Sequence, residues 1–286
     1  MGIGKLKRLL YKLYFREVVL RKYKHRRYFI NKKGFEVGGP SEIFKYTGTI
    51  PAYHFAQKID NINFSDFTTW EKKIAEGLSF KFTDRNSIEN GYQYIGEASD
   101  LGFLSNGTYD FLLSSHCIEH LANPIQGLME WVRVVKKGGV LVIVFPHKEG
   151  TFDHKRPVTS LAHLIDDYNN NTDEKDLTHL EKILALHDLN LDLPAGNIDE
   201  FKKRSLKNYE NRCLHQHVFD PKLAIELIDY MNLEIVDVVI SQPFNIEIIA
   251  KKLDVNDVAD NSQFLSLLNI RNDTTYNLQC NPVCEF

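Results

Sequence analysis

Apolar residues change their period twice between residues 109 and 146. Residues 111–113 form a short apolar run closed by two serines, and residues 140–145 form a second run that is rich in β-branched residues and does not alternate. Such runs are typical of strands covered on both faces of a sheet. Between them, apolar residues recur at helical spacing: Ile125, Leu128, Met129, Val132 and Val135. The segment therefore predicts a strand, a helix and a second, parallel strand, the βαβ unit of a parallel sheet.

Further apolar runs predict other strands and helices around this unit. Five more strands are expected, at residues 33–37, 57–62, 92–95, 233–241 and 245–251. One helix is expected to begin at Ser41. Another is expected over residues 223–231, with Asp220 as its N-cap and Pro221 at its first position. Residues 253–286 are polar, have no strong period and predict only a tail.

Residues 148–216 interrupt this pattern between the fifth strand and the last helix of the core. Two stretches within them, TSLAHLIDDY and DLTHLEKILALHD, have helical spacing. A connection of this length normally has a function of its own, and the carboxyl ends of parallel strands form the edge at which ligands bind. We therefore expect a helical insertion that caps a substrate over this edge.

Several short motifs around the βαβ unit occur in a fixed order. They are Asp110-Phe111 at the start of a strand, Ser-His-x-x-Glu-His at residues 115–120, Glu-x-x-Arg-Val at residues 130–134 and the Lys-Gly-Gly turn at residues 137–139. Together they resemble the second half of a class I S-adenosylmethionine (SAM)-dependent methyltransferase, of the methyltransferase type 11-like family. The resemblance covers roughly residues 30–147 and 216–252.

This resemblance implies an α/β, Rossmann-like fold with a seven-stranded, mostly parallel sheet and a helical insertion after strand five. The chain then divides into five parts: a basic amphipathic N-terminal segment (1–33), a SAM-binding core (34–147), a substrate cap (148–216), the end of the core (217–252) and a C-terminal tail (253–286).

The resemblance also implies which residues bind the cofactor, SAM. The glycine loop corresponds to Glu36, Gly38 and Gly39, although Pro40 and Glu42 stand where the family has its second and third glycines. An acid after strand two would bind the ribose, and an acid-alanine pair after strand three would bind the adenine. The candidates for these roles, with the serine that ends strand four, are Asp60, Glu97, Ala98 and Ser115.

Histidines are concentrated in the insertion, where seven of the chain's 11 lie between residues 147 and 217. Histidine is the side chain best suited to accept a hydroxyl proton near neutral pH. We expect His147 or His154 to be the general base, oriented by Asp153, with His116 close to the methyl group. Glu119 and His120 are interpreted as structural.

A metal-assisted alternative remains open, in which histidine and aspartate hold a divalent ion against sugar hydroxyls. No HExxH motif is present, and the only His-x-His triplet is His215-Gln216-His217, which would point both rings to one face if extended. We assign no residue to a metal.

The charges are unevenly distributed. Residues 1–33 hold 12 of the 35 basic residues and one of the 38 acidic residues, interleaved with apolar ones. A basic amphipathic helix of this kind indicates peripheral contact with an anionic membrane, packing on the acidic remainder of the chain, or pairing with a second copy of the chain. Neither a membrane span nor a signal peptide is indicated, and four scattered cysteines favour a reducing compartment. We therefore expect a cytoplasmic protein, peripheral at the inner face of the membrane if the helix binds there.

The acidic remainder also disfavours a nucleic-acid partner. We therefore predict O-methylation of a small-molecule or saccharide acceptor with a histidine base. The alternatives are a metal-assisted sugar O-methyltransferase and a catalytically inactive scaffold at a membrane surface. The sequence leaves the acceptor and the oligomeric state open.

Overall fold

The structure is a computed structural model that describes residues 23–68, 72–83, 88–241 and 244–271. Most of the basic N-terminal segment, residues 1–22, lies outside this range, and so do residues 272–286. In the described part of the basic segment, Lys24 and His25 both pair with Asp237. No helix among the described residues is long and apolar enough to span a membrane.

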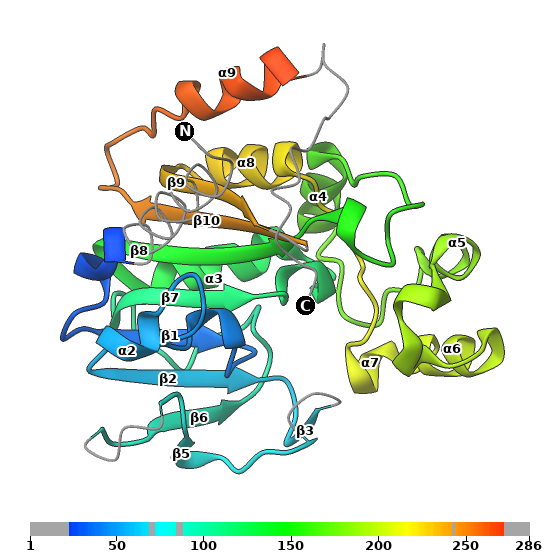
Figure 1. Cartoon of the computed structure of the whole chain (residues 1–286), viewed down its shortest axis with the longest axis horizontal. Coiled ribbons are helices and arrows are strands. Elements are labelled where there is room, and N and C mark those ends of the chain that lie inside the picture. Colours follow the sequence, from blue (N-terminus) through cyan, green and yellow to red (C-terminus); the bar gives the residue numbers. More distant parts are fainter. Residues whose placement is uncertain (1–22, 69–71, 84–87, 242–243, 272–286) are drawn as a thin grey trace, which may run out of the picture.

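One large, mostly parallel sheet organises the chain (Figure 1). Its order is β5-β6-β2-β1-β7-β8-β10-β9. The strands are β1 (Lys33–Val37), β2 (Lys58–Asn63), β5 (Gly77–Phe80), β6 (Gly91–Ile95), β7 (Tyr109–Ser115), β8 (Val135–Pro146), β9 (Leu233–Ser241) and β10 (Asn245–Lys252). Two short strands, β3 (Phe67–Thr68) and β4 (Lys72–Lys73), form a separate ribbon.

The direction of the crossovers reverses between β1 and β7. The chain runs from β1 outward to β2 and β6, then returns to β7 and β8 on the other side of β1, and all these pairings are parallel. β10 inserts antiparallel between β8 and β9. This arrangement confirms the Rossmann-like α/β fold, and it places a ligand-binding crevice at the carboxyl ends of β1 and β7.

Two expectations about the elements need correction. The sheet has eight strands rather than seven, because β5 adds an antiparallel edge to β6. The helix expected from Ser41 is only a three-residue 3-10 turn, η2 (Glu42–Phe44), followed later by α2 (Ala52–Phe55). Residues 47–49, Thr-Gly-Thr, are poor helix formers, and the chain turns there instead.

The longer helices pack around the sheet and its insertion. They are α3 (Pro124–Val134), α4 (Leu161–Asn169), α5 (Leu180–Leu186), α6 (Ile198–Ser205), α7 (Asn208–Asn211), α8 (Pro221–Tyr230) and α9 (Ser262–Arg271). The remaining 3-10 turns are η1 (Arg26–Tyr28), η3 (Ile118–His120), η4 (Lys148–Gly150), η5 (Leu189–Leu191) and η6 (Leu193–Ala195). Asp220 caps α8 by accepting from the N–H of Leu223, as expected. The C-terminal tail, for which either an ordered or a loose segment was expected, contains the helix α9.

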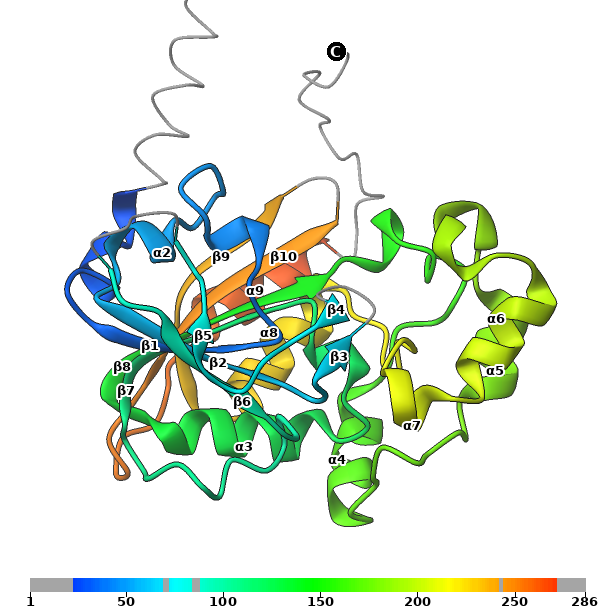
Figure 2. The same ribbon diagram turned by 90° about the horizontal axis from the view of Figure 1, so that it is seen from below.

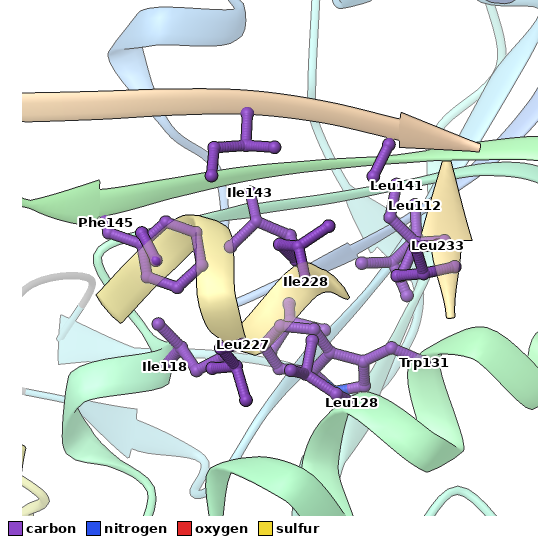
Figure 3. Close-up of a cluster of buried hydrophobic side chains, with 14 of the residues drawn as sticks. Leu112, Ile118, Leu128, Trp131, Leu141, Ile143, Phe145, Leu227, Ile228 and Leu233 are labelled. Atoms are coloured by element: carbon purple, nitrogen blue, oxygen red, sulfur yellow. The ribbon is translucent and has the colours of Figure 1, made fainter. Parts of the chain in front are cut away.

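The two faces of the sheet are buried in separate apolar clusters. Leu112, Leu141 and Phe145 point to one face, where α3 and α8 cover them (Figure 3). Phe111 and Val142 point to the other face, which α2, η1 and η2 cover. Because successive strand residues alternate between faces, both clusters come from the same apolar runs. This double burial explains why residues 140–145 are apolar without alternation.

The insertion has a small core of its own, formed by Ile183, Ala195, Phe201 and Leu214. α5, α6 and α7 lie beyond the ends to which the parallel strands point (Figures 1 and 2). α4 instead packs against α3 and α8 of the core. The insertion is therefore placed over the carboxyl edge, where a ligand of this fold would bind.

Replacing Leu227 by alanine tests how much the apolar cluster covered by α3 and α8 contributes to the free energy of unfolding. Leu227 of α8 is completely buried in this cluster, near Ile118 (Figure 3). Its truncation should lower the free energy of unfolding by about 2–5 kcal/mol, measured by urea denaturation. Leu206→Ala is the matched control, because that leucine is 53% exposed and its loss should cost about 0.5 kcal/mol or less. Equal effects of the two changes would contradict this packing.

Candidate active site

A buried carboxylate, that of Glu36, packs against the glycine turn after β1. Glu36 accepts hydrogen bonds from the Ser41 hydroxyl (2.7 Å) and the Tyr53 hydroxyl (2.6 Å). Burial, with the adjacent Glu36 charge, raises the pKa of Tyr53 well above its usual value. A Cβ added to Gly39 would lie 2.2 Å from the Glu36 carboxyl carbon. Glu36 is thus placed as a support of the turn.

The same turn is fixed from two other sides. Gly38 has a φ of +80°, a conformation that favours glycine, and a Cβ there would lie 2.2 Å from the Cys117 sulfur. Asn61 accepts from the N–H of Gly39 (3.0 Å), and the amides of Asn61 and Asn63 donate to its carbonyl. Side chains of β2 therefore determine the position of the turn.

Asp60 is not at the end of β2, contrary to expectation. It lies in the middle of the strand, three residues before Asn63, and is paired in register with Phe35. Its carboxylate accepts from the Tyr92 N–H (2.7 Å) and the Tyr109 hydroxyl (3.0 Å). The strand extends one residue further than predicted, and Asp60 points to the opposite face from Asn61. Its position within the strand and its engaged carboxylate disfavour a ribose contact by Asp60.

Glu97 and Ala98 follow β6 at the carboxyl edge, as expected. The Ala98 carbonyl accepts from the Trp131 indole N–H (2.9 Å), which fixes this loop on α3. The Glu97 carboxylate forms an ion pair with Arg212 of the insertion, while 40% of its side chain stays exposed. Arg212 also lies over the ring of Phe64, which follows β2. The insertion thus reaches the acid expected to bind adenine.

The expected pairing of Asp153 with His147 or His154 was wrong. His154 lies 2.9 Å from the Asp188 carboxylate. His147 follows β8 and accepts from the Glu149 N–H with its Nδ1 (3.2 Å), and burial lowers its pKa. Asp153 contacts neither ring, because the turns of residues 151–156 point its side chain inward.

Asp153 instead binds His215 and Arg156. Its carboxylate contacts Nδ1 of His215 and accepts from Arg156 (2.7 Å). Burial alone would raise the pKa of Asp153, but His215 and Arg156 outweigh it and lower this pKa to about 2. Burial opposes the charged form of His215, yet Asp153 outweighs it and raises the His215 pKa. Arg156 also donates to the His215 carbonyl (2.9 Å), which holds the returning chain in place.

Glu119 is the centre of a histidine cluster that our sequence analysis treated as structural. Its carboxylate is completely buried, and its Oε1 lies 3.8–3.9 Å from a ring nitrogen of His116, His120 and His215. Neither carboxylate oxygen has a hydrogen bond. Burial raises the pKa of Glu119, against the opposing effect of the nearby histidines. The sequence signal was Ser-His-x-x-Glu-His itself, but the third histidine, 96 residues beyond Glu119, had no local signal.

His116 lies between this cluster and a pocket. It is the first residue after β7 and has a φ of +53°. Its Nε2 lies 2.9 Å from the Asn245 amide oxygen at the start of β10. The pocket, of about 420 Å³, is lined by Glu42, Ile43, Thr47, Gly48, Thr49, Ser115, Ser241 and Asn245. Ser115 therefore faces this pocket, on the β10 side of the glycine turn.

Comparison with known proteins identifies part of this chain. Residues 77–143 match the family model described as a methyltransferase domain. Over 96 residues the chain is 33% identical to ajmaline N-methyltransferase from Rauvolfia serpentina, an alignment that covers 32% of this chain and 30% of that protein. The chain thus matches under a third of the length of that curated relative.

Two solved structures align over most of the chain at low identity. A SAM-dependent methyltransferase from Methanosarcina mazei has a TM-score of 0.44 and 14% identity, covering 78% of this chain and 93% of that one. A SAM-dependent methyltransferase from Aquifex aeolicus has a TM-score of 0.42 and 12% identity, covering 80% and 87%. The family match includes the βαβ unit and its motifs, which confirms the resemblance recognised in the sequence.

Replacing Gly38 by alanine tests the tight turn. Alanine would have to adopt the left-handed backbone conformation of Gly38, and its Cβ would clash with the Cys117 sulfur. Gly138 is the matched control, because its φ is +72° but nothing lies within 4 Å of an added Cβ. We expect Gly138→Ala to cost about 1 kcal/mol of stability and Gly38→Ala about 1–3 kcal/mol more, measured by urea denaturation. Equal costs would mean that Cys117 does not constrain the turn.

Proposed function

We propose that this chain, a class I SAM-dependent methyltransferase by its fold and family match, methylates a hydroxyl group of a small polar acceptor, with saccharides as the favoured class. The observation that carries the proposal is His116, held in a left-handed conformation between the buried Glu119 and Asn245, a residue of the pocket lining. Non-glycine residues in such conformations are strained and concentrate at active sites.

The carboxyl edge fits SAM at two points and differs from the family pattern at a third. Gly38 provides the left-handed turn that lets a backbone approach the methionine part, and the partly exposed Glu97 would accept from the adenine amino group. For the ribose we propose Asn63, which ends β2, in place of Asp60. When bound, SAM supplies an electrophilic methyl group.

The pocket beside Ser115 suits a polyhydroxylated acceptor. Its lining includes three hydroxyl side chains beyond Ser115, together with the Glu42 carboxylate and the Asn245 amide. Its volume lies within the range of small-molecule sites, roughly 300–1,000 Å³. Hydroxyls, carboxylates and amides bind sugar hydroxyls directly, while Ile43 is the only large apolar residue of the lining. These groups support a saccharide in preference to an apolar acceptor.

His116 is our candidate for the general base. One ring nitrogen faces Asn245, which lines the pocket, and the other faces Glu119. Methyl transfer is an in-line displacement, so the protein mainly orients the acceptor hydroxyl, excludes water and accepts the hydroxyl proton. Glu119 stabilises the imidazolium that His116 becomes. His154 is less suited to this role, because its ring contacts Asp188 of the insertion and no residue of the pocket lining.

N-methylation is the second candidate, because ajmaline N-methyltransferase is similar over part of the chain. The polar pocket lining favours oxygen acceptors over it. An inactive scaffold is disfavoured because a structural role does not need a buried carboxylate surrounded by three histidines, since such a charge is costly to bury. We also propose that residues 1–33 contact a membrane surface peripherally.

Calorimetric titration with SAM and S-adenosylhomocysteine tests the cofactor. We expect micromolar binding of both, and weaker binding for Glu97→Ala because the adenine acceptor is removed. Radiolabelled methyl transfer to a panel of saccharides, amines and carboxylic acids then tests the acceptor class. Absence of binding would contradict the enzyme proposal, and methylation of amines alone would replace the O-methylation proposal with N-methylation.

Substitution of His116 tests the base. His116→Ala should lower kcat by about 10²–10⁴-fold, the range attributed to general-base catalysis, with the Kd for SAM unchanged within a few-fold. His154→Ala is the comparison, because that ring is held by Asp188 away from Asp153, and it should change kcat by no more than a few-fold. A larger loss for His154→Ala than for His116→Ala would reverse the assignment.

A further inference from the structure

Outside the Glu119 cluster, three imidazoles and one carboxylate converge where the insertion meets the core. His163 and Asp167 lie one turn apart on α4, His179 directly precedes α5, and His217 lies in the chain that returns to α8. One potential ligand atom from each lies within 4.8 Å of the other three. The four residues come from three separate segments of the sequence.

Three of the six separations between these atoms are close to those of a tetrahedral metal site. Nε2 of His163 lies 3.1 Å from Nε2 of His179 and 3.3 Å from Oδ2 of Asp167, and Nε2 of His217 lies 3.8 Å from the same oxygen. Zinc bonds of about 2.0–2.1 Å to nitrogen and oxygen place tetrahedral ligands about 3.3 Å apart. The two separations from His163 therefore already fit such a site, and the His217 ring would have to move closer to Asp167 by about 0.5 Å.

Hydrogen bonding within the protein leaves part of this cluster unexplained. Asp167 is 7% exposed, and its Oδ2 has no hydrogen-bond partner, although its Oδ1 accepts from the Thr172 hydroxyl (3.2 Å). His217 is 1% exposed, its Nδ1 is unsatisfied, and its Nε2 has only a 3.4 Å contact with the Ala122 carbonyl. A buried polar atom without a partner is costly. A bound cation would satisfy Oδ2, while Thr172 would orient the carboxylate as an outer-shell partner.

From this geometry we infer that His163, Asp167, His179 and His217 bind a zinc ion that fastens the insertion to the core. Three imidazoles and a carboxylate are ligands that zinc accepts, and a set of four protein ligands is typical of structural sites. His163 keeps 38% of its side chain exposed, which gives the ion an entry path. The inference does not depend on the proposed function, because neither the glycine turn nor the residues that contact it belong to the four proposed zinc ligands.

The ion would also position the active-site cluster. The backbone N–H of His217 donates to the backbone carbonyl of Glu119 (3.2 Å), and His217 lies two residues after His215. Fixing the His217 ring therefore fixes the segment that brings His215 to the Glu119 carboxylate. We expect the metal to stabilise the cap rather than to contact the acceptor.

A second set of groups could compete for the metal. Glu119, His120 and His215 also offer three ligand atoms. However, this second set offers only three protein ligands, and both histidine nitrogens lie 3.9 Å from Glu119 Oε1, whereas the separations given above for the first set are 3.1–3.8 Å. Their outer nitrogens contact the Leu214 carbonyl and Asp153, so the test must distinguish the two sets.

The test uses the full chain without a histidine tag, loaded with Zn²⁺ and desalted. We expect one zinc per chain by elemental analysis. His163→Gln and His179→Gln should each lose most of it, while His120→Gln should retain it. His54→Gln is the matched control, because His54 lies in α2, away from the insertion. Circular dichroism establishes that each variant is folded.

Two further measurements make the result independent of variant folding. Saturating Zn²⁺ should raise the Tm of the chelator-treated wild type by roughly 5–10 °C, and Co²⁺ in its place should give the intense visible bands of tetrahedral coordination. SAM affinity, measured in parallel, reports on the proposed function separately. No bound zinc and no Tm shift in the wild type would overturn the inference. Zinc lost from His120→Gln but kept by His163→Gln and His179→Gln would also overturn it.

Discussion

Burial of the Glu119 carboxylate is the constraint on which the architecture of this site depends. An ionised carboxylate without compensation is too costly to keep in a protein interior. The compensation comes from two directions: His116 and His120 surround it from the same loop after β7, and His215 reaches it from the end of the insertion. The insertion therefore supplies charge to the site as well as covering it, and the carboxyl edge would be incomplete without it.

His215 can serve this purpose only because its own position is fixed by a second buried charge pair. Asp153 follows β8 and binds both His215 and Arg156, and Arg156 in turn holds the His215 carbonyl. Removing one partner of such a buried pair is usually strongly destabilising. These contacts hold the start and the end of the insertion together beside the carboxyl edge of the sheet. The zinc site that we infer would add a second connection through His217.

The core could be predicted from the sequence because its information is local. The apolar runs of β7 and β8, the spacing of α3 and the Asp220 cap each follow from neighbouring residues. The incorrect assignments had other causes. Asp60 was assigned because it is the acid nearest the end of strand two, but β2 continues three residues beyond it, and its side chain points to the opposite face from Asn61. The partner of Asp153 was missed because His215 lies 62 residues away, and no local pattern distinguishes it from His154. The proposed zinc ligands could not be recognised from the sequence for the same reason, because they come from three separate segments.

The ion pair between Arg212 and Glu97 links the insertion to the cofactor side of the edge. Arg212 has a left-handed backbone (φ +50°), and three of the other five non-glycine residues with positive φ in the described chain are asparagines, which tolerate this conformation more readily. Strain at Arg212 is maintained by its contacts with Glu97, Glu174 and the ring of Phe64. If the adenine amino group donates to Glu97, it shares this carboxylate with Arg212. Cofactor binding and the position of the insertion then become energetically coupled, because a change in one alters the contacts of the other.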